Sequence, residues 1–248
     1  MIALIPAAGY ATRLYPLTKD RPKALLEVKN QFILSHIFHK IEELEDVKKI
    51  VIVTNSNFHK KLSDWMDGYR PFIPTRVLDD GTTSNENRLG AIGDKVFAIE
   101  HEKINDDILD ISADNLFSFS LKGMHEYFKK KNAPVIALYD VGSKEEAKKM
   151  GIVEIDAGKK IIGFQEKPSE PRSTLASIGI YMYPKSVIPL FENYLAEGNK
   201  PDNPGYFIEW LHKKTPVFGY SFKETPEHKW FDIGSFDALE QAQKEFPE

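Results

Sequence analysis

The chain contains no cysteine, which excludes disulfide bonds, thiolate catalysis and cysteine metal sites. It has no run of about eighteen apolar residues, the length that a membrane-spanning helix requires. The apolar segment at its start is only as long as a strand, and no basic residues precede it, so no signal peptide is predicted. A glycosylation sequon is absent as well. These absences favour a cytoplasmic protein with no membrane partner.

Several common site signatures are also missing. The absence of G-x-G-x-x-G and of G-x-x-x-x-G-K-[ST] argues against a dinucleotide enzyme and a P-loop NTPase. The chain has no G-x-S-x-G elbow and no H-E-x-x-H pair, so no covalent nucleophile or zinc site is indicated. Its net charge is only −4 and no basic block stands out, so no nucleic-acid partner is expected.

What the chain does contain is a regular alternation of apolar runs and amphipathic helical patterns. This alternation predicts βαβ units and a mainly parallel sheet in one α/β core, which a chain of 248 residues is long enough to bury. The predicted strands are residues 2–5, 49–54, 76–78, 107–112, 134–139 and 177–183, with a hairpin formed by 151–156 and 160–166. The predicted helices are residues 33–44, 88–100, 186–196 and 205–213, and a last one from Ser235.

The first strand runs directly into a turn of small residues that carries two cations. Small side chains keep bulk away from the backbone, so that successive N–H groups can approach phosphate oxygens. Arg13 supplies a planar charged fork, and Lys23, which follows Pro22, supplies a compact second charge. The pattern predicts a triphosphate-binding loop made of Ala7, Ala8, Gly9, Tyr10, Ala11 and Thr12 together with the two cations.

This segment resembles the nucleotide-binding signature G-x-G-T-R-L-x-P-L-T-x-x-x-P-K of the sugar-phosphate nucleotidyltransferases. One position departs from the signature, because Ala11 replaces the second glycine. We expect the loop to survive this change, with the backbone of Ala11 avoiding positive φ. The alternative is that Gly9 only makes a tight turn and that Arg13 lies on the surface.

Two carboxylates are candidate metal ligands. Asp114 follows the predicted strand 107–112, at the sheet edge where ligands of α/β proteins bind, although a turn or a helix cap would also explain it. The family resemblance implies that Ala113-Asp114-Asn115 holds a catalytic Mg²⁺. It also implies that Asp232, within a W-x-D-[IT]-G-[ST] motif, is the second ligand, the alternative being an N-cap of the last helix.

The resemblance extends to the acceptor side. Lys149-Met150-Gly151 resembles the start of the family strand whose glycine lets the backbone approach the sugar, and Glu166-Lys167-Pro168 resembles its E-K-P motif. The family implies that Glu166 accepts hydrogen bonds from sugar hydroxyls and that Lys167 binds the sugar phosphate. Ser177 replaces the usual asparagine of the next motif, which puts one contact in doubt. The implied sugar-phosphate site is Asn115, Gly151, Glu166, Lys167, Gly179 and Tyr181.

The loop 80–88 is expected to contact the nucleobase. Gly81 lets the backbone reach the base edge, and Asn85 and Arg88 can add side-chain hydrogen bonds, which modestly favours a pyrimidine over guanine. The Q-x-x-P-x-G pattern of the family's thymidylyl- and uridylyltransferases is missing here, so the base stays open. The alternative is a solvated loop in which Ser84 or Asn85 caps the following helix.

The resemblance implies a Rossmann-like mixed, mostly parallel sheet flanked by helices, with a smaller acceptor-binding part in the C-terminal half. It implies an enzyme that joins a nucleoside triphosphate to a sugar-1-phosphate, with Mg²⁺ as cofactor and Arg13, Lys23, Asp114 and Lys167 as catalytic residues. We expect one nucleotidyltransferase domain, with residues 1–140 mainly binding the nucleotide and 141–248 the acceptor, no C-terminal β-helix and a single activity. The sequence does not indicate an oligomeric state or the identity of the sugar.

Two other functions stay open. The same core supports cytidylyltransferases that act on a non-sugar phosphate such as phosphocholine, and aromatic faces can bind a quaternary ammonium. The aromatic residues that raise this possibility are Tyr206, Phe207, Trp210, Trp230 and Phe231, although such residues are more often core. A non-catalytic nucleotide-sugar sensor is the third possibility. The joint presence of the cations and both aspartates argues against it.

Overall fold

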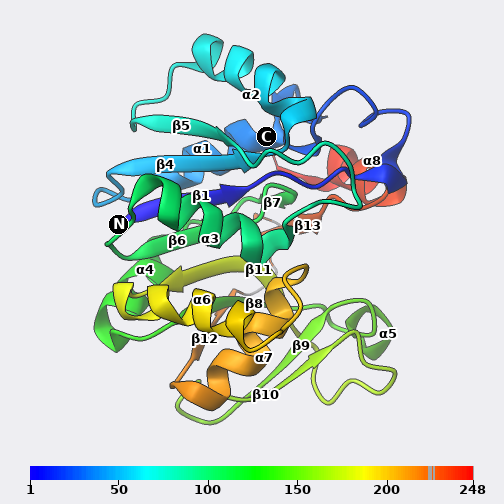
Figure 1. Cartoon of the computed structure of the whole chain (residues 1–248). Coiled ribbons are helices and arrows are strands. Elements are labelled where there is room, and N and C mark those ends of the chain that lie inside the picture. Colours follow the sequence, from blue (N-terminus) through cyan, green and yellow to red (C-terminus); the bar gives the residue numbers. More distant parts are fainter. Residues whose placement is uncertain (223–224, 226, 248) are drawn as a thin grey trace.

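A mixed sheet of nine strands forms the centre of the computed structural model, which describes residues 1–222, 225 and 227–247 (Figure 1). Its path runs β10-β9-β11-β6-β1-β4-β5, and β8 joins β11 to β12. The strands are β1 (Ile2–Pro6), β4 (Lys49–Thr54), β5 (Thr75–Asp79), β6 (Ile108–Ile111), β8 (Val135–Asp140), β9 (Gly151–Ile155), β10 (Ile161–Glu166), β11 (Leu175–Tyr183) and β12 (Phe218–Phe222).

The middle of this sheet is parallel. β1 pairs in parallel with β4 on one side and with β6 on the other, and β4 pairs in parallel with β5. The apolar runs of β1, β4 and β6 are buried because helices cover both faces of the sheet. The carboxyl ends of these strands therefore meet along one edge, and the loops that follow them lie next to one another there.

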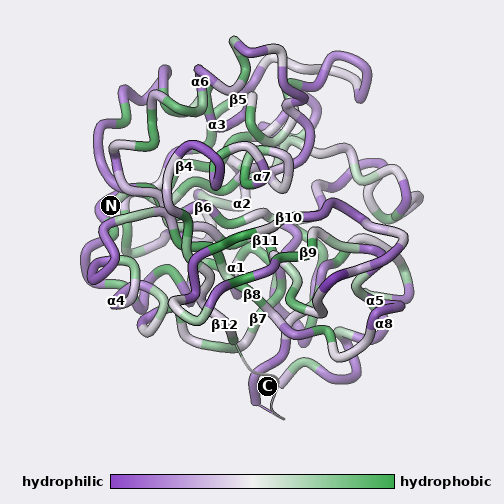
Figure 2. The backbone as a smooth tube through the Cα atoms, turned by 90° about the horizontal axis from the view of Figure 1, so that it is seen from below, coloured by the Kyte–Doolittle hydropathy of each residue, from purple (hydrophilic) through white to green (hydrophobic). Residues whose placement is uncertain are grey.

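Two helical layers enclose the sheet. One apolar core includes buried side chains of α1 (Ile33–Glu42), α2 (Ser56–Tyr69), α4 (Lys122–Lys131) and α8 (Phe236–Glu245), and a second includes those of α3 (Gly90–Glu102), α6 (Ile188–Ala196) and α7 (Pro204–Lys214). Figure 2 shows the apolar stretches gathered along the central strands and the hydrophilic ones at the periphery. Short elements complete the fold: η1 (Thr12–Leu14), η2 (Lys23–Leu25), β2 (Glu27–Val28), β3 (Gln31–Phe32), β7 (Asn115–Phe117), α5 (Lys144–Ala147), η3 (Lys185–Val187) and β13 (Trp230–Asp232).

The predicted strands and helices are all present, with ends displaced by a few residues. α3 begins at Gly90 rather than at Arg88. Gly90 has a φ of 80°, and a β-carbon there would come within 2.8 Å of the backbone of Pro201. The longer helices α2 and α4 are not among those predicted, and the strands β7, β12 and β13 were not identified either. The two three-residue strands β7 and β13 are too short to show an alternating pattern, and Gly219 interrupts that of β12.

β11 changes partners along its length and so connects the parallel centre to the outer strands. On one edge Ala176 pairs with β9 and residues 180–183 pair with β6. On the other edge β8 pairs with residues 175–177 and 181–182, and the register shifts between Ser177 and Tyr181. Gly179 lies in this shift with a φ of 70°, and a β-carbon there would come within 2.6 Å of Asn115 Nδ2. Only glycine fits this position, which brings the start of β11 against the loop after β6.

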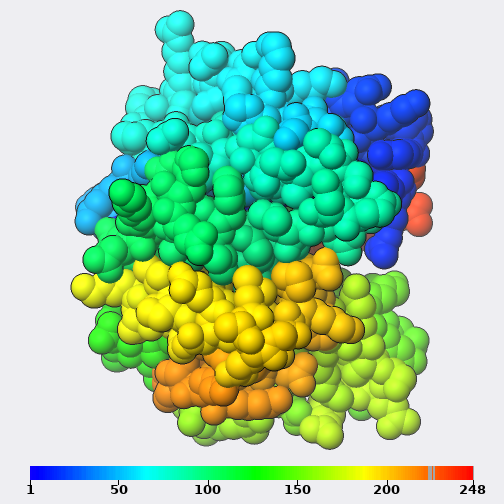
Figure 3. Space-filling model, in the orientation of Figure 1, coloured from blue at the N-terminus to red at the C-terminus, as the bar shows by residue number. Residues whose placement is uncertain are grey.

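The hairpin of β9 and β10 extends this side of the sheet. In the space-filling view a notch separates the hairpin, in yellow-green, from the N-terminal loop, in blue (Figure 3). No helix among the described residues is both long and apolar enough to cross a membrane.

Candidate active site

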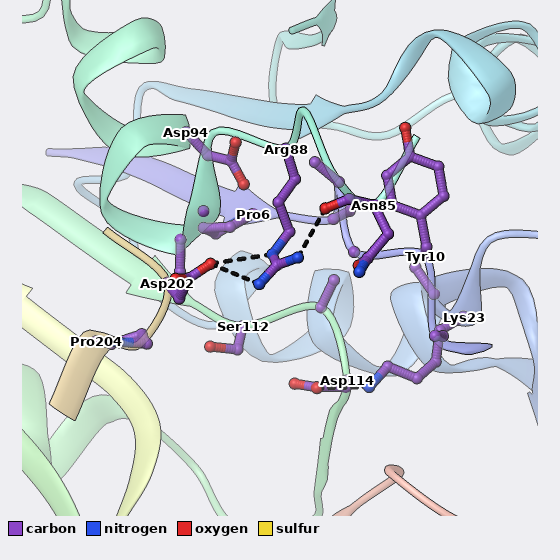
Figure 4. Close-up of a pocket in the computed structure, with 18 residues that line it drawn as sticks. Pro6, Tyr10, Lys23, Asn85, Arg88, Asp94, Ser112, Asp114, Asp202 and Pro204 are labelled. Atoms are coloured by element: carbon purple, nitrogen blue, oxygen red, sulfur yellow. Dashed lines mark hydrogen bonds and ion pairs between the residues drawn. The ribbon is translucent and has the colours of Figure 1, made fainter. Parts of the chain in front are cut away.

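Three adjoining cavities open at the carboxyl edge of the parallel strands. The nucleotide cavity, about 450 Å³, is lined by the loop after β1 and by the start of α3 (Figure 4). The acceptor cavity, about 290 Å³, is lined by β9, β10, β11 and the start of α7. A third cavity of about 240 Å³ is lined by Arg13, Lys23 and Asp232. Asp114 lines all three, so it marks the point where they meet.

The loop after β1 has the open backbone that the sequence predicts. Ala7, Ala8, Gly9, Tyr10 and Ala11 all line the nucleotide cavity. A β-carbon at Gly9 would meet no protein atom within 4 Å, so the space beside this residue belongs to the cavity. Thr12 and Arg13 lie in η1 and line the third cavity.

The expected conformation of Ala11 is wrong. Its φ is 47° and its ψ is 40°, in the left-handed region that an alanine adopts at a cost of about 1 to 2 kcal/mol. Two hydrogen bonds hold it there, because its carbonyl oxygen accepts from Thr18 Oγ1 at 2.8 Å and from the backbone N–H of Leu14 at 3.0 Å. The loop thus keeps the shape that the family glycine would favour, and the surrounding contacts offset the strain.

Asn55 supports the same loop from the next strand and was missed in the sequence analysis. It is fully buried directly after β4. Its Nδ2 donates to the Ala8 carbonyl at 2.8 Å, and its Oδ1 accepts from the backbone N–H of Phe58, which caps α2. A polar residue directly after an apolar parallel strand is the signal that could have identified it.

Lys23 and Asp114 form an ion pair in the centre of the site. Lys23 Nζ lies 2.6 Å from Asp114 Oδ2, and the side chains are 21% and 31% exposed. Burial by itself would lower the pKa of Lys23, but the carboxylate of Asp114 reverses this and the pKa lies above its usual value. The lysine therefore stays charged beside the cavity where a triphosphate would lie.

Asp232 joins this pair from the other end of the chain. β13 pairs with β7 so that Asp232 is opposite Asn115, which brings the two predicted metal-binding motifs together. The alternative function of Asp232 as a helix cap is excluded, since Ser235 Oγ accepts from Ala238 and caps α8.

Four charged groups act on Asp232 at short range. Its carboxylate opens to the cleft, yet the surrounding protein atoms limit its solvation, and this raises its pKa to about 6. The negative charge of Asp114 adds to the rise, while Lys23, Lys167 and Arg13 oppose it. All five predicted catalytic and metal-binding residues are thus brought to one place, although they come from four separate segments of the chain.

This donor set fits a magnesium ion. Mg²⁺ prefers carboxylate oxygens and usually keeps several waters while it bridges substrate phosphates, so two carboxylates suffice. The mutual repulsion of Asp114 and Asp232 is the condition that a divalent cation between them relieves. Among the described residues no cluster of three or more acidic or histidine side chains forms a complete metal cage.

Glu166 and Lys167 lie together at the end of β10 and line the acceptor cavity. Glu166 Oε1 accepts a hydrogen bond from Asn203 Nδ2 at 2.7 Å, and a β-carbon at Gly151 would come within 3.1 Å of Glu166 Oε2. Burial raises the pKa of Glu166, and the bond from Asn203 and the charge of Lys167 limit the rise. The carboxylate is thus positioned by the protein before any ligand binds. The position of Asn203 carried no signal in the sequence.

The remaining predicted acceptor residues also line this cavity, but their polar atoms are already hydrogen-bonded within the protein. Asn115 Oδ1 accepts from Trp230 Nε1 at 2.6 Å, and its Nδ2 lies 3.4 Å from the Gly179 carbonyl. Ser177 Oγ donates to the Tyr181 hydroxyl at 3.4 Å. Asn115 therefore ties β7, β11 and β13 together, whatever contact it makes with a sugar.

The residues predicted to contact the nucleobase are only partly brought together. Asn85 and Arg88 line the nucleotide cavity, whereas Gly81 does not. Arg88 donates to the Asn85 carbonyl at 2.7 Å and pairs with Asp202, its Nη2 lying 2.9 Å from Asp202 Oδ1. Neither Ser84 nor Asn85 caps α3, which has no side-chain cap, so the helix-capping alternative is wrong.

Two further residues of this cavity were missed. Asp94, on the second turn of α3, and Asp202, before α7, both line it. Asp202 comes from the half of the chain that was expected to bind the acceptor. An acidic residue on the apolar face of a predicted helix is a sequence signal for Asp94, whereas nothing in the sequence places Asp202 beside Arg88.

The aromatic group that raised the phosphocholine alternative is dispersed in the structure. Phe207 and Phe231 are core residues, and Tyr206 and Trp210 line a separate surface cavity. Only Trp230 of the five lines the acceptor cavity. No aromatic cage therefore surrounds the acceptor position among the described residues.

The family model of nucleotidyl transferases matches residues 2–248. The chain belongs to this family. A glucose-1-phosphate adenylyltransferase of Rhodopirellula baltica is 25% identical over 97% of this chain and 59% of its own length. The bifunctional protein GlmU of Methanocaldococcus jannaschii is 31% identical over 97% of this chain and 53% of its own length. The present nucleotidyl transferase thus spans little more than half the length of either relative.

Solved structures confirm the fold of this family member. A UDP-glucose pyrophosphorylase determined in complex with UDP-glucose superposes with a TM-score of 0.81 at 23% identity, over 98% of this chain and 97% of that one. The predicted Rossmann-like mixed sheet flanked by helices is therefore confirmed.

Proposed function

We propose that this nucleotidyl transferase joins a nucleoside triphosphate to a sugar-1-phosphate and releases pyrophosphate. The observation that carries the proposal is the position of Asp114, which lines the nucleotide cavity, the acceptor cavity and the small cavity between them. Two substrates that fill the larger cavities would meet at this residue. Its neighbours Lys23 and Asp232 supply charge of both signs at the meeting point.

The reaction needs positioning and charge stabilisation rather than a protein nucleophile. An oxygen of the sugar phosphate attacks the α-phosphorus of the triphosphate, and the bond from that phosphorus to the bridging oxygen of the β-phosphate breaks. Pyrophosphate leaves on the opposite side. The loop after β1 would bind the triphosphate through its backbone N–H groups, and Arg13 and Lys23 would balance the charge that builds up on the leaving group.

On the acceptor side, Lys167 would hold the sugar phosphate and Glu166 would accept hydrogen bonds from sugar hydroxyls. The fixed orientation of Glu166 supports this function, because a carboxylate already held by Asn203 loses little entropy when the sugar binds. Gly151 and Gly179 carry no side chain, so Glu166 and Asn115 can pack closely against the backbone of β9 and β11. Asn115 and Tyr181 would complete the wall of this site.

Asp114 and Asp232 would hold Mg²⁺, which, when bound, would neutralise the α-phosphate and orient the two substrates. The protein itself provides the two carboxylates and, through Lys23, a fixed orientation of Asp114.

A screen of pyrophosphate release tests the proposal. All common NTPs and dNTPs are crossed with a panel of sugar-1-phosphates and with phosphocholine, with and without Mg²⁺. We expect release that needs one triphosphate, one sugar-1-phosphate and Mg²⁺ together. Release with phosphocholine alone would favour the cytidylyltransferase alternative. Tight nucleotide binding without release from any pair would favour the sensor.

A further inference from the structure

We propose that Asp94 selects the nucleobase, and that the base carries an exocyclic amino group: adenine, cytosine or guanine rather than uracil or thymine. This inference rests on the proposed function, since it concerns the triphosphate that the nucleotide cavity binds. It identifies a specificity-determining residue on α3, outside the loop 80–88 that sequence analysis predicted to contact the base.

The positions of the predicted phosphate-binding residues indicate which end of the nucleotide cavity would hold the base. Gly9, Lys23 and Asp114 lie at one end, where the triphosphate would bind. An extended nucleotide then places its base at the opposite end, which Asp94, Arg88 and Asp202 line. Figure 4 shows this separation, with Lys23 at the right and Asp94 and Asp202 at the left.

Asp94 is a buried acid, and one of its two carboxylate oxygens has no partner. The residue is only 5% exposed, and its Oδ1 has no hydrogen-bond partner among the described residues. Burial raises its pKa to about 7, the nearby charge of Asp80 adds to the rise, and the charge of Lys95 opposes it. An unsatisfied buried carboxylate is costly, and such groups are rare unless a ligand completes them. Figure 4 shows the carboxylate pointing from α3 toward Arg88 and Pro6, inside the cavity.

The guanidinium of Arg88, the cation that lines this end, already has partners in the protein. Arg88 donates from Nε and Nη2 to Asp202 and from Nη1 to the Asn85 carbonyl. Its charge is therefore balanced by Asp202, and its guanidinium is held against the cavity wall. The carboxylates of Asp94 and Asp202 make this end of the cavity rich in hydrogen-bond acceptors.

A cavity wall that is rich in hydrogen-bond acceptors favours bases that present hydrogen-bond donors. Adenine, cytosine and guanine each present an amino group on the Watson–Crick edge, and a carboxylate accepts from it. Uracil and thymine present one N–H between two carbonyl oxygens, which a carboxylate repels. A buried polar group that is satisfied by one ligand and opposed by another produces large discrimination.

The test is the binding of ATP, CTP, GTP, UTP and dTTP to the whole protein, measured by calorimetry with Mg²⁺ and without acceptor. It is done at about pH 8.5, where the carboxyl group of Asp94, with its pKa of about 7, is ionised and only accepts hydrogen bonds. At least one of the first three should bind more tightly than UTP and dTTP by about tenfold or more, the discrimination that one good base contact provides. In Asp94→Asn, the amide can donate to a carbonyl of uracil or thymine, so the ratio should shift toward UTP and dTTP by about tenfold.

Glu100→Gln is the matched control, because it removes a negative charge from the same helix α3 at an exposed position that does not line the cavity. It should keep the order of the five triphosphates. Preferred binding of UTP or dTTP by the unmodified protein would overturn the inference and leave the proposed function intact. An Asp94→Asn protein that is more stable but binds the five triphosphates in the original order would also overturn it. Failure to bind any triphosphate would overturn both. If Asp94→Asn does not fold, the order measured on the unmodified protein still decides.

Discussion

The nucleotide cavity and the acceptor cavity share one sheet edge but are built differently. The nucleotide cavity is lined mainly by backbone and small side chains after β1, and one of its polar groups, Asp94 Oδ1, lacks a partner among the described residues. In the acceptor cavity the polar side chains are hydrogen-bonded to one another, as in Glu166 with Asn203 and Asn115 with Trp230. The nucleotide cavity therefore has a polar group that a ligand could hydrogen-bond, whereas the polar side chains of the acceptor cavity are already oriented by bonds within the protein. Substitutions should therefore affect the two substrates differently.

The largest loss of activity is expected from changes at the boundary between the two cavities. Asp114→Asn and Asp232→Asn should each lower kcat by about a hundredfold to a thousandfold, since each removes charge from the point where both substrates meet. Pyrophosphate release at saturating Mg²⁺ measures the loss. Asp237→Asn, on the exposed first turn of α8, is the matched control and should keep full activity. Unchanged, magnesium-dependent turnover in folded Asp114→Asn would contradict the assignment.

Removal of one cation from each side should separate the substrates. Arg13→Ala should weaken use of the triphosphate and Lys167→Ala use of the sugar phosphate, each by about 2 to 3 kcal/mol in kcat/KM for that substrate. Steady-state kinetics with each substrate varied in turn provides the measurement.

Two neighbouring residues serve as controls for the cations. Lys148→Ala removes an exposed lysine that pairs with Glu145 and does not line the acceptor cavity, and Arg21→Ala removes an exposed arginine beside Glu27. Both should change kcat/KM little. If Lys167→Ala left the acceptor kcat/KM unaltered, the acceptor side would be wrongly assigned.

The buried carboxyl group of Asp94 should also make the free energy of unfolding depend on pH. Asp94 has a folded pKa of about 7, above its unfolded value of 3.8, so the native state holds a proton that the unfolded chain loses. This contribution is neutral below about pH 4 and destabilises the native state progressively as pH rises toward about 7. A pKa raised from 3.8 to about 7 corresponds to about 4 kcal/mol of destabilisation at pH 8. Because a buried amide costs about 2 kcal/mol at either pH, Asp94→Asn should stabilise the protein by about 2 kcal/mol at pH 8 and destabilise it by about 2 kcal/mol at pH 4. Urea unfolding at both pH values tests this, and an equal gain at both would show that ionisation is not the cause.

The predictions made from sequence succeed where a residue adjoins a strong local pattern. Asp114 follows an apolar strand, and Arg13 and Lys23 belong to a continuous motif, so the structure brings them together as expected. Asp202 and Asn203 lie between two helices and enter the cavities only because α7 packs beside β10 and their loop reaches Arg88 and Glu166. Such contacts depend on tertiary packing, which single-sequence patterns do not encode. Asp94 is an intermediate case. The sequence shows an acidic residue on the apolar face of a predicted helix, but it does not show that this residue lines a cavity.

Ala11 provides the smallest test, and it concerns the backbone of the nucleotide side alone. Its left-handed conformation, with a φ of 47°, costs about 1 to 2 kcal/mol in an alanine, and glycine would remove that cost. Glycine also makes the unfolded chain more flexible, which offsets about 0.4 to 1 kcal/mol of the gain. Ala11→Gly should therefore raise the free energy of unfolding by about 0.5 kcal/mol and leave the acceptor KM unchanged. Ala8→Gly, at a neighbouring position where φ is not positive, is the control and should destabilise the protein by a similar amount. Equal destabilisation by both changes would mean that the bonds from Thr18 and Leu14, rather than conformational strain, set the stability of this loop.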